Sequence, residues 1–183
     1  MKNYKVGIIG ATGMVGQRFA TLLENHPWFT VTALAASKRS AGKTYKECVE
    51  SRWAMTTPIP KAMEDMIILD AANVEEVASK VDFVFCAVDM PKDQIRELEE
   101  AYAKAECPVV SNNSAHRHTP DVPMVIPEIN ADHIKIIDSQ RKRLGTKKGF
   151  VAVKSNCSLQ SYVPAVHPLR ELGCNKVLAC TYQ

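Results

Sequence analysis

The sequence predicts an α/β protein in which a parallel sheet is covered by helices on both faces. Apolar, strand-like segments alternate with helical patterns along most of the chain, and this alternation is typical of the crossover units that build parallel sheets. Segment 81–88 is an apolar run apart from Asp82 near its start, as expected for a strand that is buried on both faces. The 183 residues are enough for one domain with a sizeable core and for the beginning of a second domain.

The first two elements carry the clearest patterns. A β-branched strand is expected over residues 4–11, bounded by glycine. It precedes a helix whose apolar residues recur at the spacing of one helical face, namely Val15, Phe19, Leu22 and Leu23. This helix should stop at His26-Pro27.

The remaining elements follow by the same reasoning. Further strands are expected at 29–37, 66–72, 81–88, 107–113 and 149–155. Helices are expected at 91–106, 131–144 and 158–172, the last with an irregular start because of Pro164. The proline-containing stretch 112–127 reads as an irregular loop of the length that often carries function.

Composition excludes several classes of protein. The net charge of +3 arises from 23 basic and 20 acidic residues that are interleaved along the chain, so the basic stripe of a nucleic-acid-binding protein is missing. No apolar run has the length needed to span a membrane. The N-terminus enters a strand at once and leaves no room for a signal peptide. We therefore expect a cytoplasmic protein with neither nucleic-acid nor membrane partners.

The six cysteines form no C-x-x-C pair and no zinc-ligand spacing with histidine. No metal site is expected, and scattered thiols in a cytoplasmic chain are mostly reduced core residues.

A glycine-rich turn follows the first strand. Gly10, Gly13 and Gly16 are spaced G-x-x-G-x-x-G, a variant of the usual dinucleotide-binding pattern. Glycines allow the backbone to turn tightly and approach a pyrophosphate, which the N–H groups at the helix start would face. Between a strand and an amphipathic helix this pattern predicts nucleotide binding; the alternative is a tight turn without a ligand.

The segment after the second strand indicates which nucleotide is preferred. A site for NAD would offer a carboxylate there to hold the ribose 2′-hydroxyl. This chain has Ser-Lys-Arg-Ser-Ala-Gly-Lys over 37–43 instead. Cations and hydroxyls suit a 2′-phosphate, so the sequence favours NADP over NAD, with a solvated basic loop as the alternative.

One cysteine stands apart from the other five. Cys157 follows the strand at 149–155 and precedes the helix at 158–172. A helix N-terminus favours the thiolate form of a cysteine placed there. A thiolate beside a nicotinamide can attack an aldehyde. The carbon of the adduct then transfers a hydride to the cofactor, which leaves a thioester for a second nucleophile.

Five ordered motifs resemble the aspartate-semialdehyde dehydrogenase family, in its archaeal and fungal branch: "GIIGATGMVGQRF", "ASKRSAGKTY", "SNNSAHR", "VIPEIN" and "SNCSLQ". The resemblance covers essentially the whole chain, which corresponds to the N-terminal half of such an enzyme. It implies an NADPH-dependent, reversible reductive dephosphorylation of L-aspartyl 4-phosphate to L-aspartate 4-semialdehyde in lysine, methionine and threonine biosynthesis.

The resemblance also implies an architecture. A Rossmann-like NADP-binding domain would occupy residues 1–155, and residues 156–183 would begin an α+β catalytic and dimerisation domain. A strand at 176–183 would be the first strand of the sheet in that second domain. The partners it implies are a small-molecule substrate and inorganic phosphate, and the full-length protein would be a homo-oligomer, a dimer or tetramer.

Site roles are carried over by motif. The resemblance implies that Cys157 is the acyl-thioester nucleophile, that Asn156 and Gln183 help position the substrate, and that Arg117 binds the phosphate that attacks the thioester. The residues implied in cofactor binding are Gly10, Thr12, Gly13, Met14 and Val15 at the pyrophosphate, Ser37, Arg39 and Ser40 at the 2′-phosphate, and Cys86 and Ala87 along the groove.

Some family features have no counterpart in these residues. The general-base histidine and the arginine that holds the substrate carboxylate belong to the C-terminal half of the family, so we expect this chain alone to be inactive. His167 is interpreted as structural, and His116 and His118 as loop residues near the phosphate site. "SLQ" replaces the "STQ" of many members.

Two alternative functions stay open: a malonyl-CoA reductase of the archaeal type, and a non-catalytic NADP-binding fragment.

Overall fold

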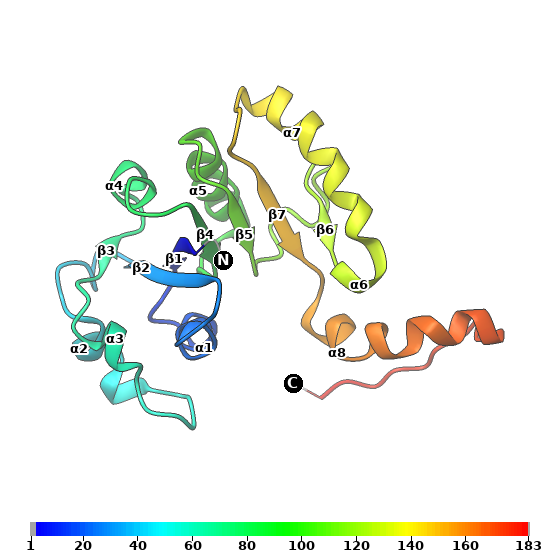
Figure 1. Cartoon of the computed structure of the whole chain (residues 1–183), viewed down its shortest axis with the longest axis horizontal. Coiled ribbons are helices and arrows are strands. Elements are labelled where there is room, and N and C mark those ends of the chain that lie inside the picture. The colour runs from blue at the N-terminus through cyan, green and yellow to red at the C-terminus, as the bar shows by residue number, and fades with distance from the viewer. Residues whose placement is uncertain (1–2, 183) are drawn as a thin grey trace.

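A single seven-stranded sheet, parallel throughout, organises the chain (Figure 1). The computed structural model describes residues 3–182. The strand order is β3-β2-β1-β4-β5-β7-β6. The strands are β1 (Tyr4–Ile9), β2 (Phe29–Ala36), β3 (Leu69–Asp70), β4 (Phe83–Cys86), β5 (Val109–Ser111), β6 (Met124–Val125) and β7 (Val151–Lys154).

The order of the strands reverses at β1. From β1 the chain first builds β2 and β3 on one side, and then returns to place β4, β5 and β7 on the other side. Ile9, at the carboxyl end of β1, pairs with both Ala35 and Cys86. The crevice outside this point is where open parallel sheets bind ligands. The predicted parallel α/β fold is confirmed.

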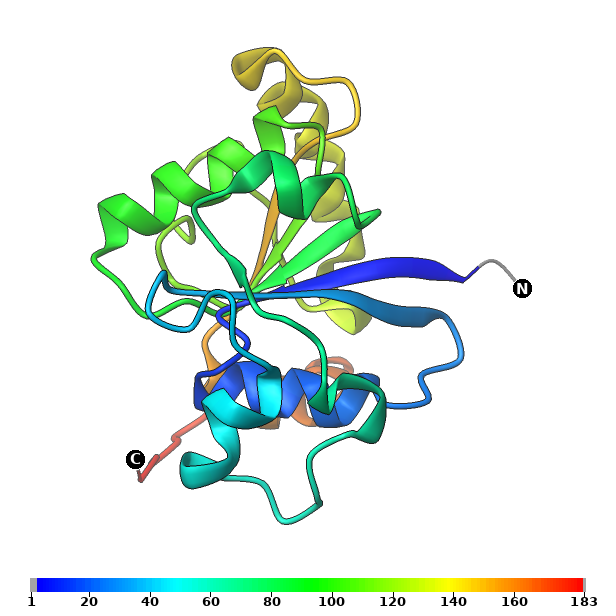
Figure 2. The same cartoon turned by 90° about the vertical axis from the view of Figure 1, so that its left-hand side faces the viewer.

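Helices cover both faces of the sheet (Figure 2). The α-helices are α1 (Met14–Leu23), α2 (Tyr45–Val49), α3 (Lys61–Glu64), α4 (Val74–Ala78), α5 (Lys92–Lys104), α6 (Pro127–Asn130), α7 (Ile137–Leu144) and α8 (Cys157–Val166). Short 3-10 helices occupy Glu50–Arg52, Ala131–Ile136 and His167–Leu172. Buried residues of α1, α2 and α3 form one apolar cluster with β1 and β2, whereas α4 and α5 contribute to a second cluster.

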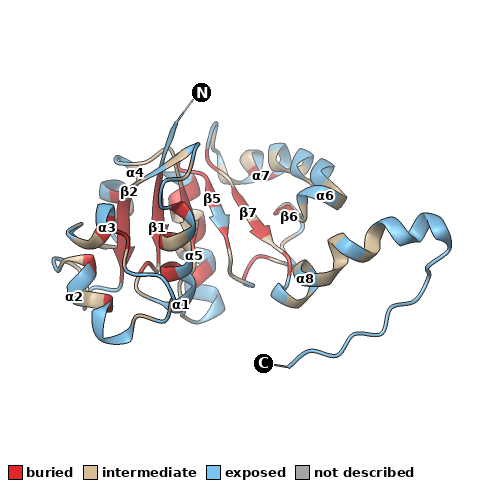
Figure 3. Cartoon of the chain, turned by 60° about the horizontal axis from the view of Figure 1, so that its bottom comes forward, coloured by how far each residue is buried: buried red, intermediate tan, exposed pale blue. Residues whose placement is uncertain are grey.

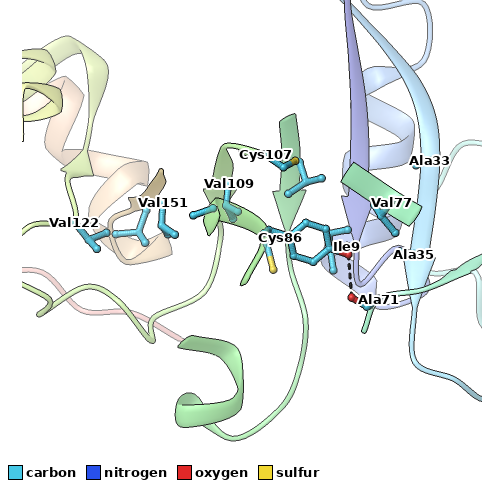
Figure 4. Close-up of a cluster of buried hydrophobic side chains, with 14 residues drawn as sticks. Ile9, Ala33, Ala35, Ala71, Val77, Cys86, Cys107, Val109, Val122 and Val151 are labelled. Carbon is cyan, nitrogen blue, oxygen red and sulfur yellow. Dashed lines mark hydrogen bonds between the residues drawn. The ribbon is translucent and has the colours of Figure 1, made fainter. Parts of the chain in front are cut away.

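The second cluster includes residues of β1, β2, β4, β5 and β7 as well as of α4 and α5 (Figure 4). Tyr102 of α5 is its largest buried side chain, and its hydroxyl donates to the carbonyl oxygen of Ala71 at 2.9 Å. A buried tyrosine hydroxyl needs such a partner. Burial raises the pKa of Tyr102, so the hydroxyl stays protonated and keeps donating.

The C-terminal part leaves the sheet (Figures 1 and 3). No residue of α8 is buried, and described residues beyond Gly173 have no regular secondary structure and are exposed. The predicted strand at 176–183 is therefore wrong over 176–182; Gln183 lies outside the described residues. A strand requires a neighbour for its N–H and C=O groups, and none is adjacent to this segment within residues 3–182.

Other differences from the predicted elements are local. The stretch 112–127 contains β6 and the start of α6 rather than only loop. The predicted helix at 131–144 begins as a 3-10 helix and becomes α-helical at Ile137. The helices α2, α3 and α4 were not predicted. Each has five residues or fewer, which is too short for apolar residues to recur with a helical period.

A single carboxylate joins the end of α5 to the turn before β7. Glu106 accepts the backbone N–H groups of Lys147 (2.8 Å), Lys148 (2.5 Å) and Gly149 (2.8 Å). These bonds lower the pKa of Glu106, with the Lys147 N–H contributing most, because they stabilise the charged form.

We predict that Glu106→Gln lowers the melting temperature at pH 7, since one amide oxygen replaces two acceptor oxygens. A carboxyl group whose pKa is lowered by folding stabilises the protein above its unfolded-state pKa and loses this contribution as pH falls through the folded-state value. The difference in melting temperature between wild type and variant should therefore shrink below about pH 4. Thermal melts by circular dichroism measure it, with the exposed Glu171→Gln as control. An equal loss at pH 7 and pH 3 would contradict the charge-based account.

Candidate active site

The glycine-rich turn joins β1 to α1 at the crevice. The N–H groups of Gly10 and Ala11 donate to the carbonyl oxygen of Ala35, at 2.8 and 3.0 Å, and Gly13 is the N-cap of α1. Gly10 has a φ of 85°, which side-chain-bearing residues rarely adopt. A Cβ at Gly10 would also overlap the carbonyl group of Ala87, and one at Gly16 would overlap the backbone of Gly10. The turn therefore needs these two glycines.

A groove of about 810 Å³ lies beside this turn. It runs along the carboxyl ends of β1, β2, β3 and β4, and its predicted residues are Gly10, Thr12, Gly13, Ser37, Arg39 and Ala87. The volume and position suit an extended nucleotide ligand.

A smaller pocket of about 380 Å³ continues from the groove into the loop after β2. Thr12, Ser37, Arg39 and Arg52 line both spaces. The smaller one adds Ser40, Lys43, Glu47 and Cys48. Three cations and three hydroxyl groups thus surround one small polar cavity, as the 37–43 motif predicts for an anionic group.

Arg52 of this pocket was missed by the sequence reasoning. It lies far along the chain from the glycine turn, and its position depends on the buried Gln17 of α1. The Gln17 side chain donates to the carbonyl oxygens of Thr12 and Arg52, both at 3.2 Å, and accepts the Ala54 N–H at 2.8 Å. No sequence pattern signals this bridge, because it joins two segments through one amide.

Three of the residues implied in cofactor binding do not line the groove with their side chains. Met14 and Val15 are exposed, at 70% and 41%. Cys86 is buried in the core, with the Asn113 amide nitrogen 3.5 Å from its sulfur. Burial, followed by the charge of Glu99, raises the pKa of the Cys86 thiol. The roles of these three residues at the cofactor stay predictions.

Cys157 occupies the first turn of α8, directly after β7. Asn156 is the N-cap of this helix, and its side-chain oxygen accepts the Ser158 N–H at 2.8 Å. Cys157 is exposed, and its sulfur is 4.0 Å from that same oxygen. The predicted strand-to-helix position of Cys157 is confirmed.

Arg117 reaches the chain just before this cysteine. Its Nε and one terminal nitrogen donate to the carbonyl oxygens of Lys154 (3.3 Å) and Ser155 (3.4 Å). The structure thus brings together two predicted site residues, Arg117 and Cys157, which lie on the loop after β5 and on α8. Gln183 lies outside the described residues.

A second cation beside Cys157 was not predicted. Burial lowers the pKa of Lys154; the Cys157 sulfur opposes this shift and the Arg117 charge adds to it. Lys154 is the last residue of β7, where the alternation of a strand gives no sign of a functional role. Lys154 therefore lies close enough to interact with both Cys157 and Arg117, and two positive groups are gathered at the chain just before the cysteine.

The strand order, the glycine turn at the reversal point and the groove together define a doubly wound, dinucleotide-binding type of domain. Residues 5–137 match the family model described as "Semialdehyde dehydrogenase, NAD binding domain". The chain belongs to this family.

Known relatives share the name of one enzyme. The chain is 41% identical over 182 residues to the aspartate-semialdehyde dehydrogenase of Archaeoglobus fulgidus, covering 98% of this chain and 50% of the relative. It is 42% identical over 155 residues to that of Aspergillus fumigatus, covering 85% and 41%. The chain thus spans about half the length of the curated relatives that it matches.

A solved structure agrees with this likeness. The crystal structure of aspartate-semialdehyde dehydrogenase with NADP from Candida albicans superposes with a TM-score of 0.80 at 37% identity, covering 93% of this chain and 48% of that one.

Among the described residues, no helix is long and apolar enough to cross a membrane.

The glycine turn gives a graded prediction. Gly10→Ala should lower the free energy of unfolding by more than about 2 kcal/mol, because the left-handed backbone costs about 1–2 kcal/mol and the overlap with Ala87 adds to it. Gly42→Ala, at φ 84° in open space, should lose only the backbone cost. Gly13→Ala has normal φ and an ordinary contact at 3.5 Å, and should lose only the smaller cost of a weaker N-cap, about 1 kcal/mol or less. Urea unfolding measures all three; equal losses at Gly10 and Gly13 would refute this order.

Proposed function

We propose that this chain is the cofactor-binding half of an NADP-dependent aspartate-semialdehyde dehydrogenase, which interconverts L-aspartyl 4-phosphate and L-aspartate 4-semialdehyde with phosphate. The single observation that carries the proposal is Cys157, exposed at the start of α8 with Arg117 bound to the adjacent backbone. The relatives of this chain carry the name of this enzyme. In this proposal residues 1–155 bind the cofactor and residues 156–183 begin the catalytic domain.

NADP fits the residues of the groove. The Gly10–Gly13 turn and the start of α1 would hold the pyrophosphate, since backbone N–H groups at a helix start bind anions. The 2′-phosphate would enter the smaller pocket, where Arg39 and Arg52 supply guanidinium donors and Ser37 and Ser40 supply hydroxyls. Glu47 also lines this pocket, and its carboxylate is held at the start of α2, where it accepts the N–H and the hydroxyl of Thr44.

The chemistry of the chain's own residues centres on Cys157. When bound, NADP supplies the hydride acceptor for the oxidative direction. The Cys157 sulfur forms a bond to the aldehyde carbon, and after oxidation of that carbon the acyl group stays on the sulfur as a thioester. Arg117 holds the inorganic phosphate, whose oxygen attacks the thioester carbon. The carbon–sulfur bond then breaks, which releases the acyl phosphate and regenerates the thiolate.

We predict that Arg39→Ala weakens NADPH binding by about tenfold or more, the equivalent of one hydrogen bond to a charged group, and leaves NADH binding nearly unchanged. Fluorescence titration of the 183-residue chain with each cofactor measures this. Arg18→Ala, an exposed arginine of α1 that lines neither pocket, is the matched control. Equal weakening of NADPH and NADH binding would contradict a 2′-phosphate pocket at Arg39.

The complete reaction is tested in a fusion of this chain to the second half of the Archaeoglobus fulgidus relative. We expect phosphate-dependent formation of NADPH from aspartate semialdehyde. Cys157→Ala should reduce the rate by about 10³-fold or more, as for other covalent nucleophiles, and Cys174→Ala, an exposed cysteine beyond α8, should not.

Two results would overturn this proposal. One is turnover that persists in Cys157→Ala. The other is a fusion that ignores aspartate semialdehyde and reduces malonyl-CoA instead.

A further inference from the structure

A buried polar cluster lies between α5 and the loop that follows β5, outside the groove and away from Cys157. Its centre is Glu99 of α5, whose side chain is 0% exposed, and His116 of the loop, at 1%. A carboxylate is almost never fully buried unless it is paired. Neither residue has a role in the chemistry above.

One oxygen of Glu99 is fully used. Oε1 accepts the Ser111 hydroxyl at 2.5 Å and the Asn113 amide at 2.9 Å. The Ser111 hydroxyl oxygen accepts the Asn113 N–H at 3.0 Å. Glu99 therefore anchors the beginning of the loop to α5.

A second residue of α5 holds the middle of the same loop. Arg96, one helical turn before Glu99, donates its Nε to the carbonyl oxygen of Ala115 at 2.9 Å. The loop segment from Ser111 to Ala115 is thus anchored to α5 at several separate points, and His116 and Arg117 follow immediately.

The other oxygen of Glu99 faces the imidazole of His116. Glu99 Oε2 and His116 Nε2 are 4.0 Å apart, and both are buried without a hydrogen-bond partner among the described residues. The opposite ring nitrogen, Nδ1, is 3.0 Å from the Thr119 hydroxyl. Leaving both atoms unsatisfied is costly. A proton on Nε2 and an approach of about 1 Å, to the length of a hydrogen bond, would let one group satisfy the other.

We propose that Glu99 and His116 are positioning residues for Arg117, with the Nε2–H of His116 directed at the Glu99 carboxylate across 4.0 Å and Nδ1 accepting from Thr119. This inference rests on the proposed role of Arg117 in binding phosphate. Because Arg117 directly follows His116, a fixed imidazole fixes the backbone from which the guanidinium reaches Lys154 and Ser155. The buried carboxylate on α5 thereby sets where phosphate binds relative to Cys157.

Two substitutions at His116 separate positioning from packing. His116→Gln places an amide NH₂ near the position of Nε2, so it can still donate to Glu99. His116→Asn places its amide near Nδ1 and leaves Glu99 without a donor. Glu99→Gln removes the charge of the acceptor while keeping its shape.

The measurement is a titration of the 183-residue chain with inorganic phosphate, followed by NMR at the Nε–H signal of Arg117. We expect His116→Asn and Glu99→Gln to weaken phosphate binding by about tenfold or more, as small misplacements of a binding group do, and His116→Gln to stay within about threefold. Equal weakening by His116→Gln and His116→Asn, with equal melting temperatures, would overturn the inference, because packing alone would then account for it. The two His116 variants decide the question if Glu99→Gln does not fold.

A second readout keeps this inference separate from the proposed function. The ¹⁵N shifts of the His116 ring in the wild-type chain report which nitrogen carries the proton. We expect protonated Nε2 and unprotonated Nδ1, with this preference lost in Glu99→Gln. If phosphate does not shift the Arg117 signal in the wild type, the phosphate-binding role proposed for Arg117 fails. A proton found only on Nδ1 contradicts the Glu99–His116 pair, whatever Arg117 binds.

Discussion

The parallel pairing of β1 with β2 and β4, and of β5 with β4 and β7, sends the carboxyl ends of these strands to one edge of the sheet. Each loop that leaves this edge carries part of the site: the glycine turn after β1, the basic loop after β2, the Arg117 loop after β5 and the Cys157 turn after β7. One edge thus collects residues from segments far apart in sequence, as parallel sheets do in general. Without this common direction the motifs would share no surface.

The strands and the main helices could be predicted from the sequence because their patterns are local. The apolar run at 81–88 and the helical spacing of 14–23 each report burial against the sheet. The strand expected at 176–183 could not be judged in the same way. Its apolar residues suit a strand, but a strand forms only beside a partner, and Val177, Leu178 and Tyr182 are exposed here. The apolar pattern shows only that a segment can form a strand, and the presence of a neighbouring strand decides whether it does.

The site residues show the same difference between local patterns and tertiary contacts. The positions of the glycine turn, the 37–43 loop and Cys157 could be predicted because each depends on one contiguous segment. Arg52 and Lys154 were missed because tertiary contacts place them, through the Gln17 amide and through the burial of the last residue of β7. Cys86 is a residue that the motif places at the groove but whose side chain the structure places elsewhere. The motif implies a groove position, yet strand alternation turns its side chain into the core and leaves Ala87 at the groove.

The charges at this edge explain why it would attract anions although the chain carries a net charge of only +3. Of the carboxylates that line these spaces, Glu47 accepts from Thr44 and Asp70 accepts the Ala72 N–H at 3.0 Å, while Asp89 and Glu97 line the larger groove. Glu99 is buried beneath the loop that carries Arg117. The arginines of the groove instead line open space, where a charge acts on a ligand through less screening than on the outer surface. The local field therefore depends on where the charges lie relative to the open space, and a net charge counted over the whole chain does not reveal this.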